Sequence, residues 1–416
     1  MKDNENLGLG LKSRAGRESC GDETSPPLAR GVVLAFSVCL LTLISARGQT
    51  ELQVSKAIEV VGQTKPIPVS MSGFSGEVAQ VLEFDLYVQG FTFTSPEAAQ
   101  YLITGSNNGS VTGQLRDPHN NSTMLSKAYT GASLRRQAHA FSDDIVLKVT
   151  GRKGIAQTKI ACKVQNGANS EIYIADFDGH NAQMVTRDDT LVVAPCWVPG
   201  RLALYYTSYK LNHPDIFYHD LSTGTRRVFA RYGGSNMSPA ASPDGSQVAM
   251  ILSKDGWTDL YVCQADGTDL RRLTKSPQDE SSPCWSPDGK WICYAAKDKE
   301  HRSLCKIPAS GGTPQRIATT GTPSPTEPDW SPDNKWIAYT AQYRNFEICV
   351  VPAGGGQATL LVDGEDPSWA PNSRTLIYTR RQGGGTVLSL LDAPTKQVKD
   401  VSRISGSSNS QPSWAR

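Results

Sequence analysis

The sequence lacks a strong charge of either sign. Its 416 residues carry 42 Lys and Arg against 40 Asp and Glu, so the formal net charge is only +2. A balance this close to zero gives no general attraction to nucleic acids or to anionic membranes. Intrinsic disorder is excluded too, because hydrophobic residues make up 38% of the chain and charged residues only 20%. We therefore expect a folded protein that does not bind nucleic acid and whose specificity comes from local surface shape.

Long hydrophobic runs are also scarce. Residues 31–44 form an uncharged apolar run of fourteen, directly after Arg30. A helix of this length is too short to cross a hydrocarbon core of about 30 Å, but it is typical of a secretory leader. Ala46 and Gly48 place small residues where a signal peptidase requires them. The sequence predicts a signal peptide over residues 1–48 and an exported product, with an uncleaved membrane anchor as the alternative.

Paired cysteines and clustered histidines are absent as well. Of nine cysteines, seven follow the leader, an odd number without the short paired spacings of a metal site or a disulfide scaffold. At least one must stay unpaired, and those within expected strands (Cys162, Cys293, Cys305 and Cys349) are interpreted as small core residues. The six histidines are scattered along the chain. We expect no metal, no cofactor and no catalytic residue.

What the second half does contain is a repeat, Pro-x-Trp-Ser-Pro-Asp-Gly in its fullest form. Its equivalent positions are Trp197, Ala241, Trp285, Trp330, Trp369 and Trp414, at intervals of 44, 44, 45, 39 and 45 residues. A period of 40 to 45 residues with several short strands in each unit is typical of propeller blades. Ser-Pro-Asp-Gly is a turn that a strand follows, and the repeated Trp is interpreted as packing between blades and not as a ligand-stacking surface.

The two ends of the repeat region complete each other. Residues 157–186 supply the last three strands of a unit, whereas residues 411–416 supply only the first. Pairing the strand around Trp414 with the strand over residues 158–164 would close the ring and leave no open sheet edge. The predicted fold is mainly β: a six-bladed β-propeller of WD40-like, PD40-type repeats over residues 154–416.

A small α/β domain is expected before the propeller, over residues 65–153. Apolar residues follow helical spacing over residues 76–88 and 133–150. Three short strands are expected between the two helices, over residues 101–104, 110–116 and 123–129. Residues 49–64 form an N-terminal arm directly behind the cleavage site.

These parts, in this order, resemble the TolB family, periplasmic proteins of the Tol-Pal system of Gram-negative bacteria. The most specific text lies at the junction of the two domains: residues 133–145 read SLRRQAHAFSDDI, residues 147–155 read LKVTGRKGI, and residues 158–161 read TKIA. Upstream, Asp85-Leu86, Gly90-Phe91 and residues 101–105 (YLITG) are similar to the family too.

The resemblance implies a monomeric, periplasmic binding protein without catalysis. One propeller face would bind the peptidoglycan-associated lipoprotein Pal, and the mature N-terminal arm would bind the inner-membrane protein TolA, in support of outer-membrane integrity and of constriction at cell division. For the arm, the residues are Gln49, Thr50, Glu51, Leu52, Gln53 and Val54.

The loops that lead into the inner strands should line the face for Pal. Their residues are Ser235, Asn236, Met237, Ser238, Glu280, Ser281, Ser282, Thr326, Glu327, Glu365, Asp366, Ser410 and Gln411. The alternative interpretation is that some of them merely connect blades, because few residues of any interface carry its affinity.

An enzyme is the main alternative function, since similar propellers accompany hydrolases and lyases. The hydrolase motif Gly-x-Ser-x-Gly is missing: residues 73–77 read GFSGE and fail at the last position. Asp176-x-Asp178-Gly and Asp266-Gly-x-Asp269 could suggest calcium, but between paired strands they are hairpin turns first. His139 could act at the domain interface, although a hydrogen-bonded structural role is the simpler interpretation.

Overall fold

Most of the described chain is β-structure in eight sheets, six of which have four strands each. The computed structural model describes residues 61–131, 133–299, 301–343, 345–402 and 404–416. The expected leader and residues 49–60 of the expected arm lie outside these ranges. Within them, no helix has the length and apolar character needed to cross a membrane.

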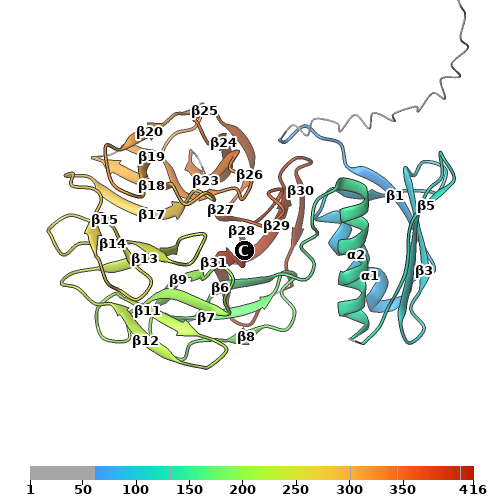
Figure 1. Ribbon diagram of the computed structural model, residues 1–416, viewed down its shortest axis with the longest axis horizontal. Coiled ribbons are helices and arrows are strands. Elements are labelled where there is room, and N and C mark those ends of the chain that lie inside the picture. The colour runs from blue at the N-terminus through green and yellow to red at the C-terminus, as the bar shows by residue number, and fades with distance from the viewer. Residues whose placement is uncertain (1–60, 132, 300, 344, 403) are drawn as a thin grey trace, which may run out of the picture. The chain divides into compact units, whose positions relative to one another are not determined.

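A five-stranded sheet with two helices on one face forms the N-terminal part (Figure 1). The helices are α1 (Gly76–Tyr87) and α2 (Leu134–Thr150), close to the predicted ranges. In sheet order the strands are β2 (Phe91–Phe93), β1 (Ile67–Ser72), β3 (Tyr101–Ser106), β4 (Val111–Asp117) and β5 (Ser122–Tyr129). Strands β1 and β2 had not been predicted; they run parallel to each other, and β1 also runs parallel to β3.

Local sequence fixes the ends of α2. The side chain of Ser133 accepts a hydrogen bond from the Arg136 backbone at 3.3 Å. At the other end, Gly151 adopts a φ of 71° and its N–H donates to the Leu147 carbonyl at 2.9 Å. Buried Phe141 and Ile145 then face the core that α2 shares with α1 and the sheet.

The six four-stranded sheets surround a common centre in Figure 1, which confirms the predicted six-bladed propeller. The first blade joins β31 (Ser408–Trp414) to β6 (Lys159–Asn166), β7 (Asn169–Asp176) and β8 (Gln183–Met184). The next blades are β9 (Val192–Trp197), β10 (Ala203–Ser208), β11 (Asp215–Asp220) and β12 (Arg226–Ala230); then β13 (Asn236–Ala241), β14 (Gln247–Leu252), β15 (Asp259–Gln264) and β16 (Arg271–Arg272).

The second half of the ring has the same pattern. Its blades are β17 (Asp279–Trp285), β18 (Trp291–Asp298), β19 (His301–Pro308) and β20 (Gln315–Ile317); then β22 (Pro325–Trp330), β23 (Trp336–Gln342), β24 (Phe346–Pro352) and β26 (Thr359–Asp363); and last β27 (Glu365–Trp369), β28 (Thr375–Gln382), β29 (Gly385–Asp392) and β30 (Gln397–Asp400). A small parallel pair, β21 (Thr319–Thr320) and β25 (Gly356–Gln357), lies outside the blades.

The C-terminal strand closes the ring as predicted. Strand β31 pairs antiparallel with β6, with Trp414 opposite Ile160 and Ser413 opposite Ala161. One of the repeated Trp residues bonds directly to the preceding blade: Trp285 Nε1 donates to the Ala240 carbonyl at 2.9 Å. The expected strand cysteines lie in β6, β18, β19 and β24, and the seven cysteines of the described residues are free thiols.

The α/β domain and the propeller form one compact unit. Buried Val88, which follows α1, packs in one cluster with Ile155 of the connecting segment and Phe177 of the first blade. The Thr375 hydroxyl donates to the Val88 carbonyl at 3.2 Å. The amides of Gly62 and Thr64 donate to the carbonyls of Ala393 and Pro394, both at 3.0 Å.

Candidate functional site

A ring of bulges shapes the inner wall of the propeller. Each inner strand has one residue with a positive φ directly before a proline, and its register with the second strand shifts there. Such backbone is unfavourable for residues other than glycine and gathers at functional sites. The six residues are Ala194, Ser238, Ser282, Glu327, Asp366 and Gln411, with φ between 50° and 56°.

Side chains of this bulge ring bond from blade to blade along half of its circumference. Glu327 accepts from the Asp366 amide at 3.1 Å, Asp366 accepts from the Gln411 amide at 3.2 Å, and Gln411 accepts from the Ala194 amide at 3.0 Å. Ala194, Ser238 and Ser282 on the other half have shorter side chains, and none of them bonds the next bulge among the described residues. The bulge ring forms the mouth of the central channel. One half of this mouth is acidic and rigid, and the other half has small, neutral side chains.

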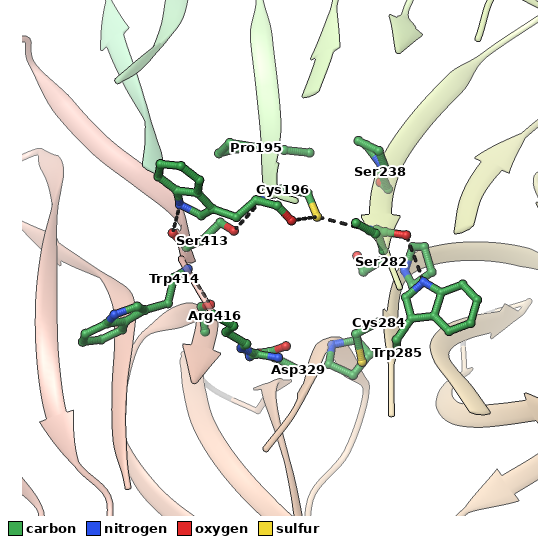
Figure 2. Close-up of a pocket in the computed structure, with 18 of the residues that line it drawn as sticks. Pro195, Cys196, Ser238, Ser282, Cys284, Trp285, Asp329, Ser413, Trp414 and Arg416 are labelled. Atoms are coloured by element: carbon green, nitrogen blue, oxygen red, sulfur yellow. Dashed lines mark hydrogen bonds and ion pairs between the residues drawn. The ribbon is translucent and has the colours of Figure 1, made fainter. Parts of the chain in front are cut away.

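The bulge ring leads into a central cavity of about 350 Å³. Figure 2 shows its labelled residues around an open centre, with Pro195 and Cys196 across from Asp329 and Arg416. The Arg416 guanidinium forms an ion pair with Asp329 and donates to the Trp330 carbonyl at 3.3 Å. Arg416 and Asp329 thus neutralise each other beside Trp330, whereas the carboxylates of the bulge ring form no ion pair within 4 Å among the described residues, and Lys163 acts on Asp366 only from a longer distance.

The Asp366 carboxyl of the bulge ring holds its proton more tightly than a free carboxyl. Burial, together with the neighbouring Glu327 and Glu365 carboxylates, raises the pKa of Asp366 to about 8. The hydroxyl of Thr379 and the amide of Gln411 donate to Asp366 at 3.1 and 3.2 Å and oppose this shift. At pH 7 a proton on Asp366 relieves the repulsion in the mouth.

The raised pKa of Asp366 predicts a pH-dependent stability. Between pH 4 and 8 the folded protein holds a proton here that the unfolded chain has released, so the free energy of unfolding falls as pH rises. Asp366→Asn keeps the accepting oxygen without the charge. We expect urea melts to show equal stability of parent and variant at pH 4 and a more stable variant at pH 8. Asp288→Asn serves as the control, because hydrogen bonds lower the pKa of Asp288. If Asp366→Asn is less stable than the parent at pH 8, the raised pKa of Asp366 is contradicted.

The structure brings part of the predicted face together. Ser238, Ser282, Glu327, Asp366 and Gln411 line the cavity. Ser235, Met237, Glu365 and Ser410 are half-buried and Ser281 is exposed, all outside the cavity lining. The predicted arm residues, Gln49 to Val54, lie outside the described residues.

Three predicted face residues are buried. The Asn236 side chain accepts from the Tyr232 amide at 2.8 Å and donates to the Tyr232 carbonyl at 3.0 Å, so it holds its own loop. Glu280 accepts from the Leu260 amide at 2.9 Å, and burial raises its pKa to about 7. Thr326 is only 6% exposed.

Two aromatic residues on the same face escaped prediction. Trp257 is 50% exposed and Tyr343 is 68% exposed, each in the hairpin between the second and third strands of its blade. These hairpins lie beside the loops that lead into the inner strands: the Glu280 amide donates to the Thr258 carbonyl at 3.0 Å, and the Gly364 amide donates to the Phe346 carbonyl at 2.8 Å. Large aromatic side chains in turns, such as Gly256-Trp257, are the only sequence signal.

The other candidate residues from the sequence lie at hairpin turns or at the domain interface. Asp176 ends β7, Asp178 lies in the turn between β7 and β8, and Asp266 lies in the turn between β15 and β16. Within the described ranges no group of three His, Cys, Asp or Glu side chains is arranged to hold a metal ion. His139 is buried at the domain interface and contacts two carboxylates.

Comparisons with known proteins agree with this architecture. The family description "TolB beta propeller domain" (PD40) matches residues 146–416. The "Tol-Pal system protein TolB" of Bordetella pertussis is 33% identical over 361 residues, which cover 85% of this chain and 81% of that protein. The protein of the same name from Bordetella bronchiseptica is also 33% identical, over 80% of its length. The crystal structure of TolB from Acinetobacter baumannii shares the fold, with a TM-score of 0.77 at 23% identity, over 85% of this chain and 98% of that one.

Proposed function

Since this chain belongs to the TolB family of Tol-Pal system proteins, we propose that it is a periplasmic adaptor that binds other proteins and catalyses no reaction. The observation that carries the proposal is the extent of the similarity, which reaches beyond the propeller: 361 aligned residues cover 85% of the chain. A propeller kept only as a scaffold for a hydrolase or lyase would not need the α/β domain that precedes it here.

The outer-membrane lipoprotein Pal is the proposed partner of the channel mouth. The bulge ring supplies fixed acceptors and hydroxyls, and Trp257 and Tyr343 supply exposed aromatic surface around it. Interfaces concentrate their affinity in a few aromatic and charged residues surrounded by neutral contacts. A rigid polar ring within an aromatic rim fits a folded protein partner better than a small-molecule substrate.

The inner-membrane protein TolA is the proposed partner of the N-terminal arm, residues 49–54. Together the two contacts would connect the outer and inner membranes, in support of envelope integrity and of constriction at division. Deletion of residues 49–55 should abolish capture of TolA from envelope extract and leave capture of Pal intact. Loss of Pal with retention of TolA would contradict this division of labour.

Truncation of the aromatic rim tests the proposed Pal surface. Trp257→Ala and Tyr343→Ala should each weaken binding of the soluble Pal domain about tenfold or more, because exposed Trp and Tyr are common anchors of interfaces. Titration calorimetry with purified proteins measures the change directly.

Leu202→Ala is the matched control for this experiment. Leu202 is 45% exposed but lies in the hairpin after β9, at the opposite end of the inner strands. Its truncation should leave the affinity unchanged. Equal losses at Leu202 and Trp257, or none at Trp257 and Tyr343, would place the Pal surface elsewhere.

A further inference from the structure

One histidine is held between the two domains by carboxylates from both. His139 of α2 is only 4% exposed. Its Nδ1 donates to Asp85 Oδ2 of α1 at 2.8 Å, and its Nε2 lies 3.5 Å from Asp178 Oδ2 in the first blade of the propeller. Asp85 and Asp178 are themselves almost fully buried.

The surrounding charges are predominantly acidic. Asp143 of α2 and Asp176 of β7 act on the same imidazole electrostatically. Arg135, one turn before His139, forms an ion pair with Asp178, contacts Glu77 of α1 at 3.0 Å and donates to His180 Nδ1 at 2.8 Å. The Lys159 ammonium lies 2.9 Å from Asp176. Since Arg135 and Lys159 are shared with other carboxylates, a positive imidazolium is the charge that balances Asp85.

Hydrogen bonding at the His139 ring is incomplete. Its Nε2 and the Asp85 Oδ1 atom are buried without a hydrogen-bond partner among the described residues. An unpaired buried polar atom is costly. The cost at Nε2 is smallest when that nitrogen carries a proton directed at Asp178, because the interaction across 3.5 Å is then between opposite charges.

Apolar contacts exclude water from this group. The ring of Phe177, next to Asp178, lies 5.8 Å from the His139 ring and 5.8 Å from Phe84 of α1, both centroid to centroid. On its other side Phe177 contacts Trp414 of the closing strand, at 6.4 Å. The imidazole thus lies within the apolar contact that joins the α/β domain to the propeller.

We propose that protonated His139 is a pH-sensitive clamp: held by Asp85 and Asp178, it fastens the α/β domain to the propeller, and loss of its proton loosens that contact. No other part of the molecule needs to change for the contact to respond. The clamp affects how firmly the α/β domain is attached to the propeller. It does not depend on which proteins bind the channel mouth.

The pKa values of three groups at the contact are raised. Burial lowers the pKa of His139, but its hydrogen bond and the charges of Asp85 and Asp178 outweigh this and raise it overall. Burial raises the pKa of Asp85 to about 6 despite His139, and burial raises that of Asp143. The pKa of Asp176 is lowered instead, because hydrogen bonds from Asn181 and Lys159 outweigh its burial. His139, Asp85 and Asp143 each hold more protons when buried at the contact than when free, so through these groups docking takes up protons and weakens as pH rises.

The amides of Gly62 and Thr64 report on docking, because both donate to propeller carbonyls. Their hydrogen exchange, corrected for the intrinsic pH dependence, should accelerate in the full mature chain between pH 6 and 8. Each proton linked to docking contributes at most about tenfold per pH unit to this increase. In the His139→Gln variant, which keeps a donor for Asp85, the exchange rates of these amides should no longer depend on pH above 6.5. His219→Gln, in β11 of the second blade, is the matched control and should keep it.

Two further measurements keep the clamp falsifiable if His139→Gln fails to fold. The imidazole resonance of His139 in the parent should titrate above pH 6.5, and Asp178→Asn should lower this midpoint and shift the exchange profile with it. A midpoint below 6.5, an exchange profile without pH dependence in the parent, or an unchanged profile in His139→Gln would each overturn the proposal.

Discussion

Removal of Ser413–Arg416 is expected to lower the melting temperature of the propeller by about 8 °C or more. These four residues complete the blade that joins the two ends of the ring. Trp414 is 2% exposed and packs in the cluster of Ile160 and Phe177. Loss of one buried Trp side chain alone costs about 3–5 kcal/mol, and each kcal/mol lowers the melting temperature of a domain of this size by about 2–4 °C.

The polar contacts of the same segment extend its effect around the ring. Trp414 Nε1 donates to the Thr158 hydroxyl at 2.8 Å, and Trp197 Nε1 of the next blade donates to the Ser413 carbonyl at 3.1 Å. Arg416 forms its ion pair with Asp329, two blades earlier along the chain. Deletion therefore leaves a donor of Trp197 and acceptors in other blades unpaired, and the whole propeller should melt earlier in one transition.

Calorimetry on matched variants separates ring closure from the individual contacts. Trp414→Ala should account for most of the loss, whereas deletion of Arg416 alone should cost less, because that ion pair is partly exposed. If the deletion of Ser413–Arg416 leaves the transition unchanged, β31 does not close the ring.

The propeller could be predicted from sequence because its signals are local and repeated. Each Ser-Pro-Asp-Gly turn fixes one hairpin, and its recurrence gives the number of blades without any knowledge of distant contacts. The same counting paired Trp414 with the strand that contains Ile160, 254 residues earlier, since only that strand lacked a partner. Strands β1 and β2 were missed because parallel pairing depends on contacts between distant segments and leaves no hairpin signature.

The candidate site was predictable in position but not in chemistry. The proline two residues before each repeated Trp marks the inner strand, yet nothing in the sequence shows that the residue before it adopts a positive φ, as Asp366 does. Burial of Asn236 and Glu280 depends on how their loops fold back on the blades. The acids around His139 come from positions 54 residues before it and 39 residues after it, so no local pattern could reveal them.

Arg374→Ala is expected to destabilise the protein by about 3–5 kcal/mol, because it leaves a buried carboxylate without its counter-charge. Arg374 is 4% exposed, and its Nη2 donates to Asp392 Oδ2 at 2.9 Å. Gly90 of the α/β domain lies against the guanidinium: a Cβ atom there would come within 1.9 Å of Nη2. The ion pair thus supports both the last blade and the turn that follows α1.

The pH dependence of this loss identifies its cause. Burial raises the pKa of Asp392, and Arg374 opposes that shift. Without Arg374 the pKa rises further, so the folded variant holds a proton over a wider range, and its deficit in urea melts should shrink as pH falls from 7 towards 5. Arg374→Met combined with Asp392→Asn removes both charges and should be more stable than Arg374→Ala. Arg381→Ala, which breaks an exposed pair with Glu365, should cost less than about 1 kcal/mol. A pH-independent deficit in Arg374→Ala would instead assign the loss to packing around Gly90.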